Sequence, residues 1–252
     1  MINLLNQVAV VTGGSRGIGA AVALKLAEAG ADVAIIYQKN LNSAQKIVHQ
    51  INTLGKKAKY FRCNVSDYLQ CKSTVHKILK TFGKIDILVN NAGVWEYGVI
   101  GKMKPQQWEK TIDINLNGTF NMCNLIVPHM KRRKYGRIIN ISSTAGQRGE
   151  PFHSHYAASK GGVIAFTKSL SVELIKYNIW VNCVAPGWVL TDMVLPELRK
   201  KQNRNSILKT IPRGKFAKPE EIAGPVVFLA SSLSDNIVGE IINVNGGSVL
   251  CG

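Results

Sequence analysis

Residues 8–19 read Val-Ala-Val-Val-Thr-Gly-Gly-Ser-Arg-Gly-Ile-Gly, and this stretch decides the fold. The apolar residues predict a buried strand, the glycines predict a tight turn, and residues 20–29 are mostly helix formers. Glycine lets backbone N–H groups approach a phosphate closely at the positive N-terminus of a helix. The spacing is G-x-x-x-G-x-G rather than G-x-G-x-x-G, so a turn that only packs helix on strand is the alternative. Its position in a first strand–helix unit favours dinucleotide binding.

Further apolar runs recur along the chain, separated by longer helix-forming segments. They occupy residues 33–36, 59–61, 85–89, 137–141, 179–184 and 240–244. Continuous apolar runs indicate strands that are buried on both faces. Regular alternation of strand and helix predicts a parallel sheet with right-handed crossovers. We therefore expect an α/β protein with one domain over residues 1–252, a Rossmann-type doubly wound sheet of seven parallel strands with helices on both faces.

The longest irregular stretch, residues 186–219, follows the sixth expected strand and contains a basic helix-like segment at 197–209. Open α/β sheets bind ligands beyond the carboxyl ends of their strands. Long insertions at such a place are often functional. We therefore expect a substrate lid around residues 188–215.

The composition is that of a globular protein, with 46% hydrophobic residues, but 32 Lys and Arg against 15 Asp and Glu give a net charge of +17. Such an excess attracts anions, whether nucleic acid, phosphorylated cofactors, acidic proteins or anionic lipid. No apolar run reaches the ~18 residues of a membrane span, and the N-terminus lacks the pattern of a secretory signal. The cysteines are scattered singly without a neighbouring histidine cluster, which predicts neither a metal site nor a disulfide framework. We expect a cytoplasmic protein. The cysteines are Cys63, Cys71, Cys123, Cys183 and Cys251.

The end of the second strand indicates which dinucleotide binds. NAD-binding proteins usually place Asp or Glu there to hold the ribose 2′-hydroxyl, whereas residues 37–40 here are Tyr-Gln-Lys-Asn. Arg16 in the glycine turn and Lys39 after the strand are cations that suit a 2′-phosphate. NADP(H) is therefore favoured over NAD(H), the alternative being that Lys39 is a solvated loop residue.

Tyr156-Ala-Ala-Ser-Lys160 places a phenol and an ammonium on one face of a helix. A neighbouring cation is expected to lower the pKa of the phenol, so that it exchanges a proton near neutral pH. Ser143 ends the fifth strand, where its hydroxyl can hold a substrate carbonyl. The pair Tyr-x-x-x-Lys is common by chance, and a surface helix is the alternative interpretation.

These motifs together resemble the short-chain dehydrogenase/reductase family. The resemblance rests on an ordered set that spans nearly the whole chain: residues 12–19, Asn64-Val65, Asn90-Asn91-Ala92-Gly93, Asn115, Ser143, Tyr156-x-x-x-Lys160, Pro186-Gly187 and residues 243–247. Within the family, the pattern is most similar to 3-oxoacyl-acyl-carrier-protein reductases, with acetoacetyl-CoA reductases nearby.

The resemblance implies a role for each residue of a catalytic set. Tyr156 is expected to be the general acid that protonates the substrate carbonyl, and Ser143 to orient that carbonyl. Lys160 is expected to lower the pKa of the phenol and to hydrogen-bond the nicotinamide ribose. Asn115 is expected to hold a water that links Lys160 to solvent.

The resemblance also implies cofactor contacts along the same edge of the sheet. Asn64 and Val65 are expected beside the adenine, although many relatives have Asp at position 64. The implied cofactor-binding residues are Gly13, Ser15, Arg16, Gly17, Ile18, Gly19, Lys39, Asn64, Val65, Asn91, Ala92, Gly93, Tyr156, Lys160, Pro186, Gly187, Val189 and Thr191.

The basic residues 131–134 and Lys176 fall near segments where the resembled reductases dock an acidic acyl carrier protein. We expect this patch beside the mouth of the active site, where it would suit an acyl carrier or the phosphates of CoA. A second basic stretch, residues 199–204, lies in the expected lid. A solvated face is the alternative for both. The resemblance further implies a homotetramer, and no motif supports specific nucleic-acid binding.

The substrate is less constrained than the cofactor. Trp95, Glu96, Tyr97 and Trp188 are expected to line an acyl pocket, and bulky aromatics there favour short acyl chains or a ring-shaped ketone. The predicted reaction is NADPH-dependent reduction of a ketone, foremost 3-oxoacyl-acyl-carrier-protein in fatty acid synthesis. Acetoacetyl-CoA, a sugar, a steroid or a quinone are alternatives. The intact catalytic set argues against a catalytically silent binding relative.

Overall fold

The computed structural model describes residues 2–250 and has a single sheet of seven strands in the order β3-β2-β1-β4-β5-β6-β7. All neighbouring strands are parallel. This confirms the predicted doubly wound α/β fold. The strands are β1 Val8–Thr12, β2 Asp32–Tyr37, β3 Ala58–Arg62, β4 Ile87–Asn90, β5 Gly136–Ile141, β6 Ile179–Pro186 and β7 Ile241–Val244.

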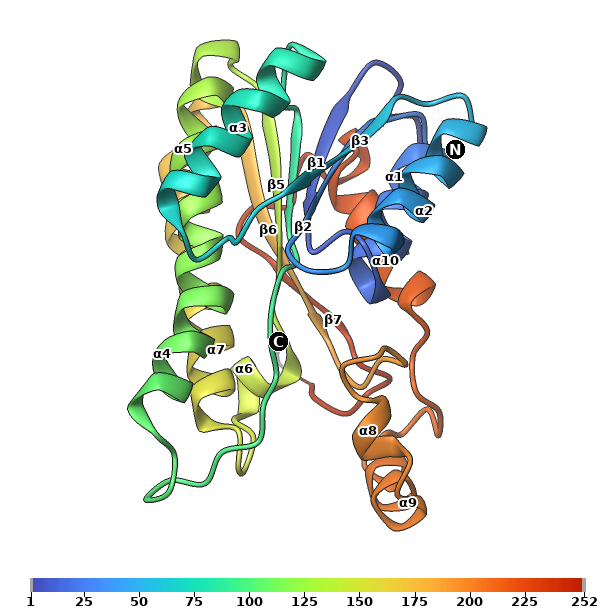
Figure 1. The fold of residues 1–252 in the computed structure, drawn as a ribbon, viewed down its shortest axis with the longest axis vertical. Coiled ribbons are helices and arrows are strands. Elements are labelled where there is room, and N and C mark those ends of the chain that lie inside the picture. Colours follow the sequence, from blue (N-terminus) through green and yellow to red (C-terminus); the bar gives the residue numbers. More distant parts are fainter. Residues whose placement is uncertain (1, 251–252) are drawn as a thin grey trace.

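Helices cover both faces of the sheet, with α1, α2 and α10 on one side and α3, α5 and α7 on the other (Figure 1). The α-helices are α1 Gly17–Glu28, α2 Leu41–Thr53, α3 Tyr68–Phe82, α4 Pro105–Ile112, α5 Gly118–Arg133, α6 Thr144–Arg148, α7 Ser154–Leu174, α8 Leu195–Leu198, α9 Lys201–Lys209 and α10 Pro219–Leu229. The short helices are the π-helix η1 Asp113–Asn117 and the 3-10 helices η2 Ile175–Tyr177 and η3 Ser232–Ser234.

The central strands are buried on both faces, as their continuous apolar sequence predicts. In β1, Ala9 and Val11 pack into the core beneath α1, α2 and α10, whereas Val10 packs into the core beneath α3 and α5. Asp86, which we expected inside the fourth strand, lies just before β4. Its buried carboxylate accepts a hydrogen bond from the backbone N–H of Val8 at 2.8 Å.

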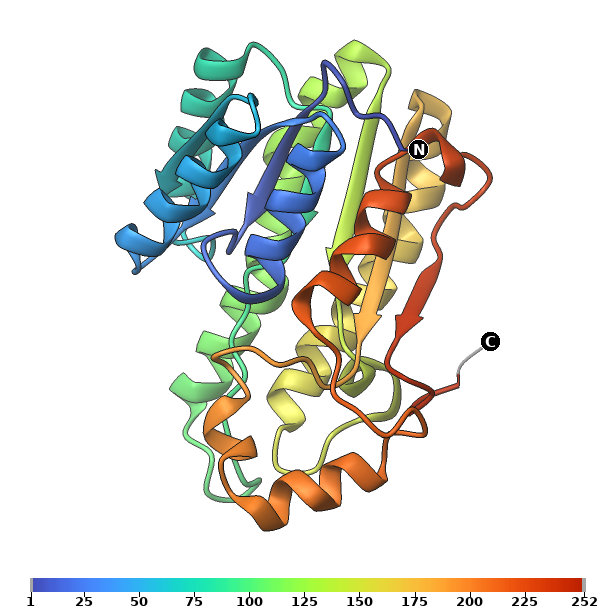
Figure 2. The ribbon, with the colours of Figure 1, turned by 90° about the vertical axis from the view of Figure 1, so that its right-hand side faces the viewer.

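Because the strands are parallel, their carboxyl ends meet at one edge of the sheet. The glycine turn after β1, Asn91 after β4, Ser143 after β5 and Gly187 after β6 therefore converge there. Helices α8 and α9 lie beyond this edge (Figure 2). The segment that carries them has a small apolar core of its own, formed by Leu198, Ile211 and Phe216.

Within residues 2–250, no helix is both long and apolar enough to cross a bilayer. No group of three or more His, Cys, Asp or Glu side chains in this part of the chain is placed to hold a metal ion. The four cysteines among these residues are buried free thiols, and Cys251 lies outside the described residues.

Candidate active site

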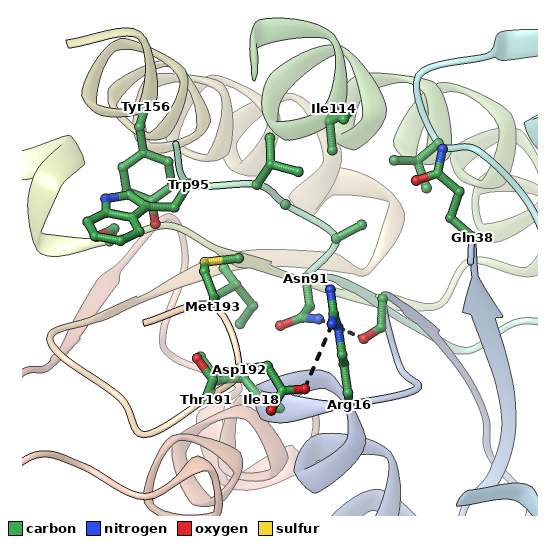
Figure 3. Close-up of a pocket in the computed structure, with 18 of the residues that line it drawn as sticks. Arg16, Ile18, Gln38, Asn91, Trp95, Ile114, Tyr156, Thr191, Asp192 and Met193 are labelled. Atoms are coloured by element: carbon green, nitrogen blue, oxygen red, sulfur yellow. Dashed lines mark hydrogen bonds and ion pairs between the residues drawn. The ribbon is translucent and has the colours of Figure 1, made fainter. Parts of the chain in front are cut away.

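A cavity of about 1200 Å³ occupies the carboxyl edge of the sheet. One end is lined by the glycine turn and by residues after β2, and the other by Tyr156 and Trp188. Figure 3 shows Arg16 and Gln38 toward the first end and Tyr156 and Trp95 toward the second. A cavity of this volume has room for a dinucleotide with a substrate beside it.

The glycine turn has the backbone geometry that its sequence predicts. Gly13 and Gly17 have φ values of +64° and +53°, which residues with a Cβ rarely adopt. A Cβ on Gly19 would lie 2.3 Å from the carbonyl oxygen of Gly13 and 2.5 Å from Nδ2 of Asn91. The turn therefore brings the backbone close to the cavity at the N-terminus of α1, where an anion is stabilised.

Asn91 fastens this turn to the end of β4. Its Nδ2 donates hydrogen bonds to the carbonyl oxygens of Thr12, at 3.0 Å, and Gly13, at 3.3 Å. The Thr12 hydroxyl accepts hydrogen bonds from the backbone N–H groups of Asn91 and Ala92. The two strand ends that border the switch in strand order, β1 and β4, are thus held in register by side chains.

The structure brings nearly all predicted cofactor-binding residues to this one cavity. Gly19 is the exception, because it lies buried beneath the turn rather than on the cavity wall. The predicted residues that line the cavity are Gly13, Ser15, Arg16, Gly17, Ile18, Lys39, Asn64, Val65, Asn91, Ala92, Gly93, Tyr156, Lys160, Pro186, Gly187, Val189 and Thr191.

Lys160 extends from α7 into the floor of the cavity. Its Nζ donates a hydrogen bond to the carbonyl oxygen of Ile141 at 2.8 Å and lies 5.9 Å from the centre of the Tyr156 ring. The residue is only 5% exposed. Burial lowers the pKa of Lys160 to about 8.

Tyr156 differs from our expectation. We predicted that the neighbouring cation lowers the pKa of the phenol, but burial raises that pKa to about 12, against a smaller lowering by the hydrogen bond with the Ser143 side chain. Desolvation of the phenolate, together with the negative charge of Glu150, outweighs the stabilisation of the phenolate by Ser143. The phenol therefore keeps its proton at neutral pH, the state that a proton donor needs.

Ser143 and Asn115 are both held in place by backbone groups. Ser143 caps α6, and its Oγ accepts a hydrogen bond from the backbone N–H of Ala145 at 3.1 Å. Asn115 lies in η1, where its Oδ1 accepts from the backbone N–H of Val94 at 2.8 Å. Its Nδ2 donates to the carbonyl oxygen of Val94 and to Oγ of Ser159, both at 3.0 Å. These bonds join the Asn115 side chain to the segment after β4 and to α7, and the water that we expected it to hold stays a prediction.

Two cations flank the cofactor end of the cavity. Arg16 forms an ion pair of 3.7 Å with Asp192, which follows β6, and both side chains are about two-thirds exposed (Figure 3). Lys39 is exposed on the cavity rim. Exposed ion pairs contribute at most about 1 kcal/mol, so Asp192 leaves Arg16 available to a stronger anion.

The substrate end holds residues that motif analysis missed. Arg148 and Glu150, from the segment between Ser143 and Tyr156, line the cavity, as do Lys110 and Met193. No spacing rule connects these residues with the catalytic set, because they come from α4, the end of α6 and two irregular segments that only the folded chain brings together. The aromatic residues Trp95 and Trp188, which we did expect, contact each other edge to face at 5.8 Å.

The basic patch is not where we expected it. Residues 131–134 precede β5 and Lys176 follows α7, so both lie at the amino edge of the sheet, opposite the cavity. Two of these charges are also paired within the chain: Lys131 with Glu173 at 3.4 Å, and Arg133 with Asp86 at 3.2 Å. The prediction that this patch borders the active-site mouth is therefore wrong.

Comparison with known proteins places this fold and site in one family. Residues 7–202 match the short chain dehydrogenase family. The chain is 40% identical to the 3-oxoacyl-(acyl-carrier-protein) reductase FabG of Thermotoga maritima, covering 99% of this chain and all of that protein. It is also 40% identical to the FabG of Staphylococcus aureus strain Mu50, covering 96% and 98% of the two chains. A putative short-chain alcohol dehydrogenase from Sinorhizobium meliloti 1021 superimposes with a TM-score of 0.94 at 32% identity, covering 98% of each chain.

The protein therefore belongs to the short-chain dehydrogenase family. It is an oxidoreductase with a site for a nicotinamide cofactor, as the sequence motifs predicted. The curated relatives above, which match over almost their full length, are reductases of 3-oxoacyl groups carried on acyl carrier protein.

Proposed function

We propose that this protein reduces a ketone to a secondary alcohol with NADPH, and that its foremost substrates are 3-oxoacyl thioesters, as in fatty acid synthesis. The observation that carries the proposal is the convergence of Ser143, Tyr156 and Lys160 on the cavity that also contains the glycine turn. The identity to 3-oxoacyl-(acyl-carrier-protein) reductases over nearly the full chain supports the choice of substrate.

The residues at the substrate end supply the proton and hold the carbonyl. A bound nicotinamide cofactor supplies the hydride. The neutral phenol of Tyr156 donates its proton to the carbonyl oxygen, and the hydroxyl of Ser143 hydrogen-bonds that oxygen. Lys160, as a buried cation, stabilises the phenolate that remains after proton transfer.

The residues at the other end fit a dinucleotide with a 2′-phosphate. The glycine turn has room for backbone beside the cavity but not for side chains. A Cβ at Gly13, Gly17 or Gly19 would crowd neighbouring atoms. Arg16 and Lys39 line the cavity beside β2, and residues 37–40 contain no carboxylate for a 2′-hydroxyl. These groups support NADP(H) over NAD(H).

The segment that we predicted to be a lid has a basic surface on the same side of the sheet as the cavity. Residues 199–204 include four cations at the start of α9, beyond the carboxyl edge of the sheet. They, rather than residues 131–134, are placed to attract an acidic acyl carrier protein or the phosphates of CoA. We further infer a cytoplasmic homotetramer in which the exposed face of α7, with Val172 75% exposed, and the edge strand β7 are covered.

Steady-state kinetics on a panel of ketones tests this proposal. The panel contains acetoacetyl-CoA, a longer 3-oxoacyl thioester, a quinone and a cyclic ketone, each assayed with NADPH and with NADH. We expect the highest kcat/KM with a 3-oxoacyl thioester and a lower KM for NADPH than for NADH. Turnover confined to the quinone or the cyclic ketone would contradict the substrate, and a lower KM for NADH would contradict the cofactor.

A further inference from the structure

Glu150 places a carboxylate in the wall of the substrate end, where the proposed reaction does not use one. It lies in the irregular segment between α6 and α7, and its side chain is 19% exposed. Its Oε2 accepts a hydrogen bond from Nε1 of Trp95 at 3.2 Å. An ionised carboxylate has about four acceptor positions, so one indole N–H leaves most of them open.

The second oxygen of Glu150 has no hydrogen-bond donor among residues 2–250. Nδ1 of His153 is 4.0 Å from Oε1, beyond hydrogen-bond distance, and lies closer, at 3.1 Å, to the carbonyl oxygen of Pro151. Glu96, another carboxylate that lines the cavity, differs in this respect because it forms a close ion pair with Lys110. Glu150 is thus the less satisfied of the two.

The indole that donates to the Glu150 carboxylate is packed against other rings. Trp95 stacks on the His153 ring, with centres 4.3 Å apart and planes 4° apart, and contacts Trp188 edge to face. The indole that donates to Glu150 is therefore packed on two sides, and moving it would break both ring contacts. A pre-organised acceptor of this kind favours a ligand that matches it without a cost of rearrangement.

The charge of Glu150 acts on the group that donates the proton in the proposed reaction. Glu150 and Tyr156 line the same cavity, and the negative charge of Glu150 contributes to the raised pKa of the Tyr156 phenol. A substrate group that extends from a ketone at Tyr156 toward Trp95 therefore meets the carboxylate to which Trp95 donates.

The free energy of binding depends on which substrate group contacts the Glu150 carboxylate. Burial is already the main influence on the Glu150 carboxyl and raises its pKa. An alkyl group against the carboxylate removes remaining water and returns no hydrogen bond, whereas a hydroxyl returns one. Sites built around such a polar group reject an analogue that lacks the matching donor far more strongly than apolar pockets reject an added methylene.

We propose that Glu150 is a specificity-determining residue that accepts a hydrogen bond from a hydroxyl group of the substrate, so that the site selects small hydroxylated ketones over ketones with an alkyl group at the same place. The indoles of Trp95 and Trp188 pack against the C–H surface of that substrate. This inference rests on the proposed ketone reduction and narrows its substrate class. Among 3-oxoacyl thioesters, it implies a preference for acyl groups that carry a hydroxyl at this place over acyl groups that carry an alkyl group there.

Two matched pairs of ketones test the proposal on the intact enzyme with NADPH. The pairs are 4-hydroxy-2-butanone with 2-pentanone, and 1-hydroxy-2-propanone with 2-butanone; in each pair a hydroxyl replaces a methyl group. We expect the wild-type protein to favour the hydroxylated ketone by about tenfold or more in kcat/KM in at least one pair. Glu150→Leu should abolish that preference, and Glu150→Gln, which keeps an acceptor oxygen, should retain part of it.

Glu109→Gln is the control, because it changes an exposed carboxylate of α4 outside the cavity wall, and it should leave the ratio within each pair unchanged. Binding provides a readout independent of turnover: with NADP⁺ present, 1,3-butanediol should quench tryptophan fluorescence at a lower concentration than 2-pentanol, and Glu150→Leu should remove the difference. Equal values for both members of each pair in the wild-type protein, or a ratio that survives Glu150→Leu, would overturn the inference. Absence of turnover with every ketone would contradict the proposed function, and the binding comparison would still decide the role of Glu150.

Discussion

The two ends of the cavity are built from different parts of the chain. The cofactor end is made mainly of backbone, from the turn after β1 and the segments that follow β4 and β6, with glycines where the chain must come close. The substrate end is made of side chains, from Tyr156 of α7 and from irregular segments that carry Trp95, Glu150 and Trp188. Hydride chemistry needs the same dinucleotide geometry whatever the substrate, whereas each substrate needs its own wall.

This difference explains what the sequence can predict. Strands with continuous apolar residues, a glycine turn after the first of them and a Tyr-x-x-x-Lys helix have fixed local spacings, and the structure confirms the fold that they predict. Glu150 has no such spacing, because only the tertiary packing of Trp95 and His153 against it makes it part of the site.

The misplaced basic patch carries a second lesson. Residues 131–134 are close in sequence to Ser143, but they precede β5 whereas Ser143 follows it. The two ends of a strand lie a full strand length apart. Residues just before a strand and residues just after it therefore lie at opposite edges of the sheet. The raised pKa of Tyr156 could not be predicted from the sequence either, because it depends on how deeply the folded protein buries the phenol.

The largest expected effect belongs to the substrate end. Tyr156→Phe removes the proton donor and should lower kcat/KM for ketone reduction by about 10³-fold, while NADPH binding, measured by fluorescence titration, changes little. Tyr135→Phe, in the loop before β5 at the amino edge, is the matched control and should behave as the wild-type protein. If Tyr156→Phe keeps more than about a tenth of the activity, equivalent to ~1.4 kcal/mol of barrier, Tyr156 is excluded as the acid.

At the cofactor end, Gly19→Ala should do comparable damage through the backbone. Its Cβ would lie 2.3 Å from the carbonyl oxygen of Gly13, so the turn must move. We expect a loss of about 1–3 kcal/mol in the free energy of unfolding and a large loss of NADPH binding. Gly224→Ala in α10, where a Cβ meets nothing within 4 Å, is the control and should be neutral or slightly stabilising. If Gly19→Ala binds NADPH with unchanged affinity, NADPH binding does not depend on the close packing of the glycine turn.

The buried lysine predicts a pH dependence. Burial lowers the pKa of Lys160 from 10.5 to about 8, so the side chain is mostly cationic at pH 7 and loses its charge as the pH rises through 8. If the cation is needed, kcat/KM for NADPH with saturating ketone should fall up to tenfold per pH unit above about pH 8. Lys160→Met should remove this limb along with most activity, whereas Lys168→Met, an exposed lysine of the same helix, should keep it. A flat profile to pH 9.5 in the wild-type protein would count against the role of Lys160.

A smaller effect is expected from the cations that flank the cofactor. Arg16→Ala and Lys39→Ala should each raise the KM for NADPH by about tenfold, because one charge-assisted contact with a phosphate is worth about 1.5 kcal/mol. The KM for NADH should stay nearly constant. Lys46→Ala, an exposed lysine of α2 outside the cavity wall, provides the comparison. If the KM values for NADPH and NADH change equally, these cations do not bind the 2′-phosphate.

The smallest effect should come from the basic residues 199–204 in the segment that we predicted to be a lid. Replacing Lys200, Lys201 and Arg204 together by Glu should raise the KM for a substrate on acyl carrier protein a few-fold at low salt, with the difference fading as salt rises. The same change at Lys131, Arg132 and Lys134, at the opposite edge of the sheet, is the matched test. If that second triple variant has the larger effect, the docking surface for acyl carrier protein lies at the amino edge of the sheet.

Transfer of a labelled hydride tests the central claim most directly. The protein is incubated with acetoacetyl-CoA and NADPH that carries deuterium on the transferring face of the nicotinamide C4, and the product is analysed by mass spectrometry. The account predicts 3-hydroxybutyryl-CoA with one deuterium at C3 from the wild-type protein and almost none from Tyr156→Phe in the same time. A hydroxyacyl product without deuterium, or equal labelling by Tyr156→Phe, would contradict it.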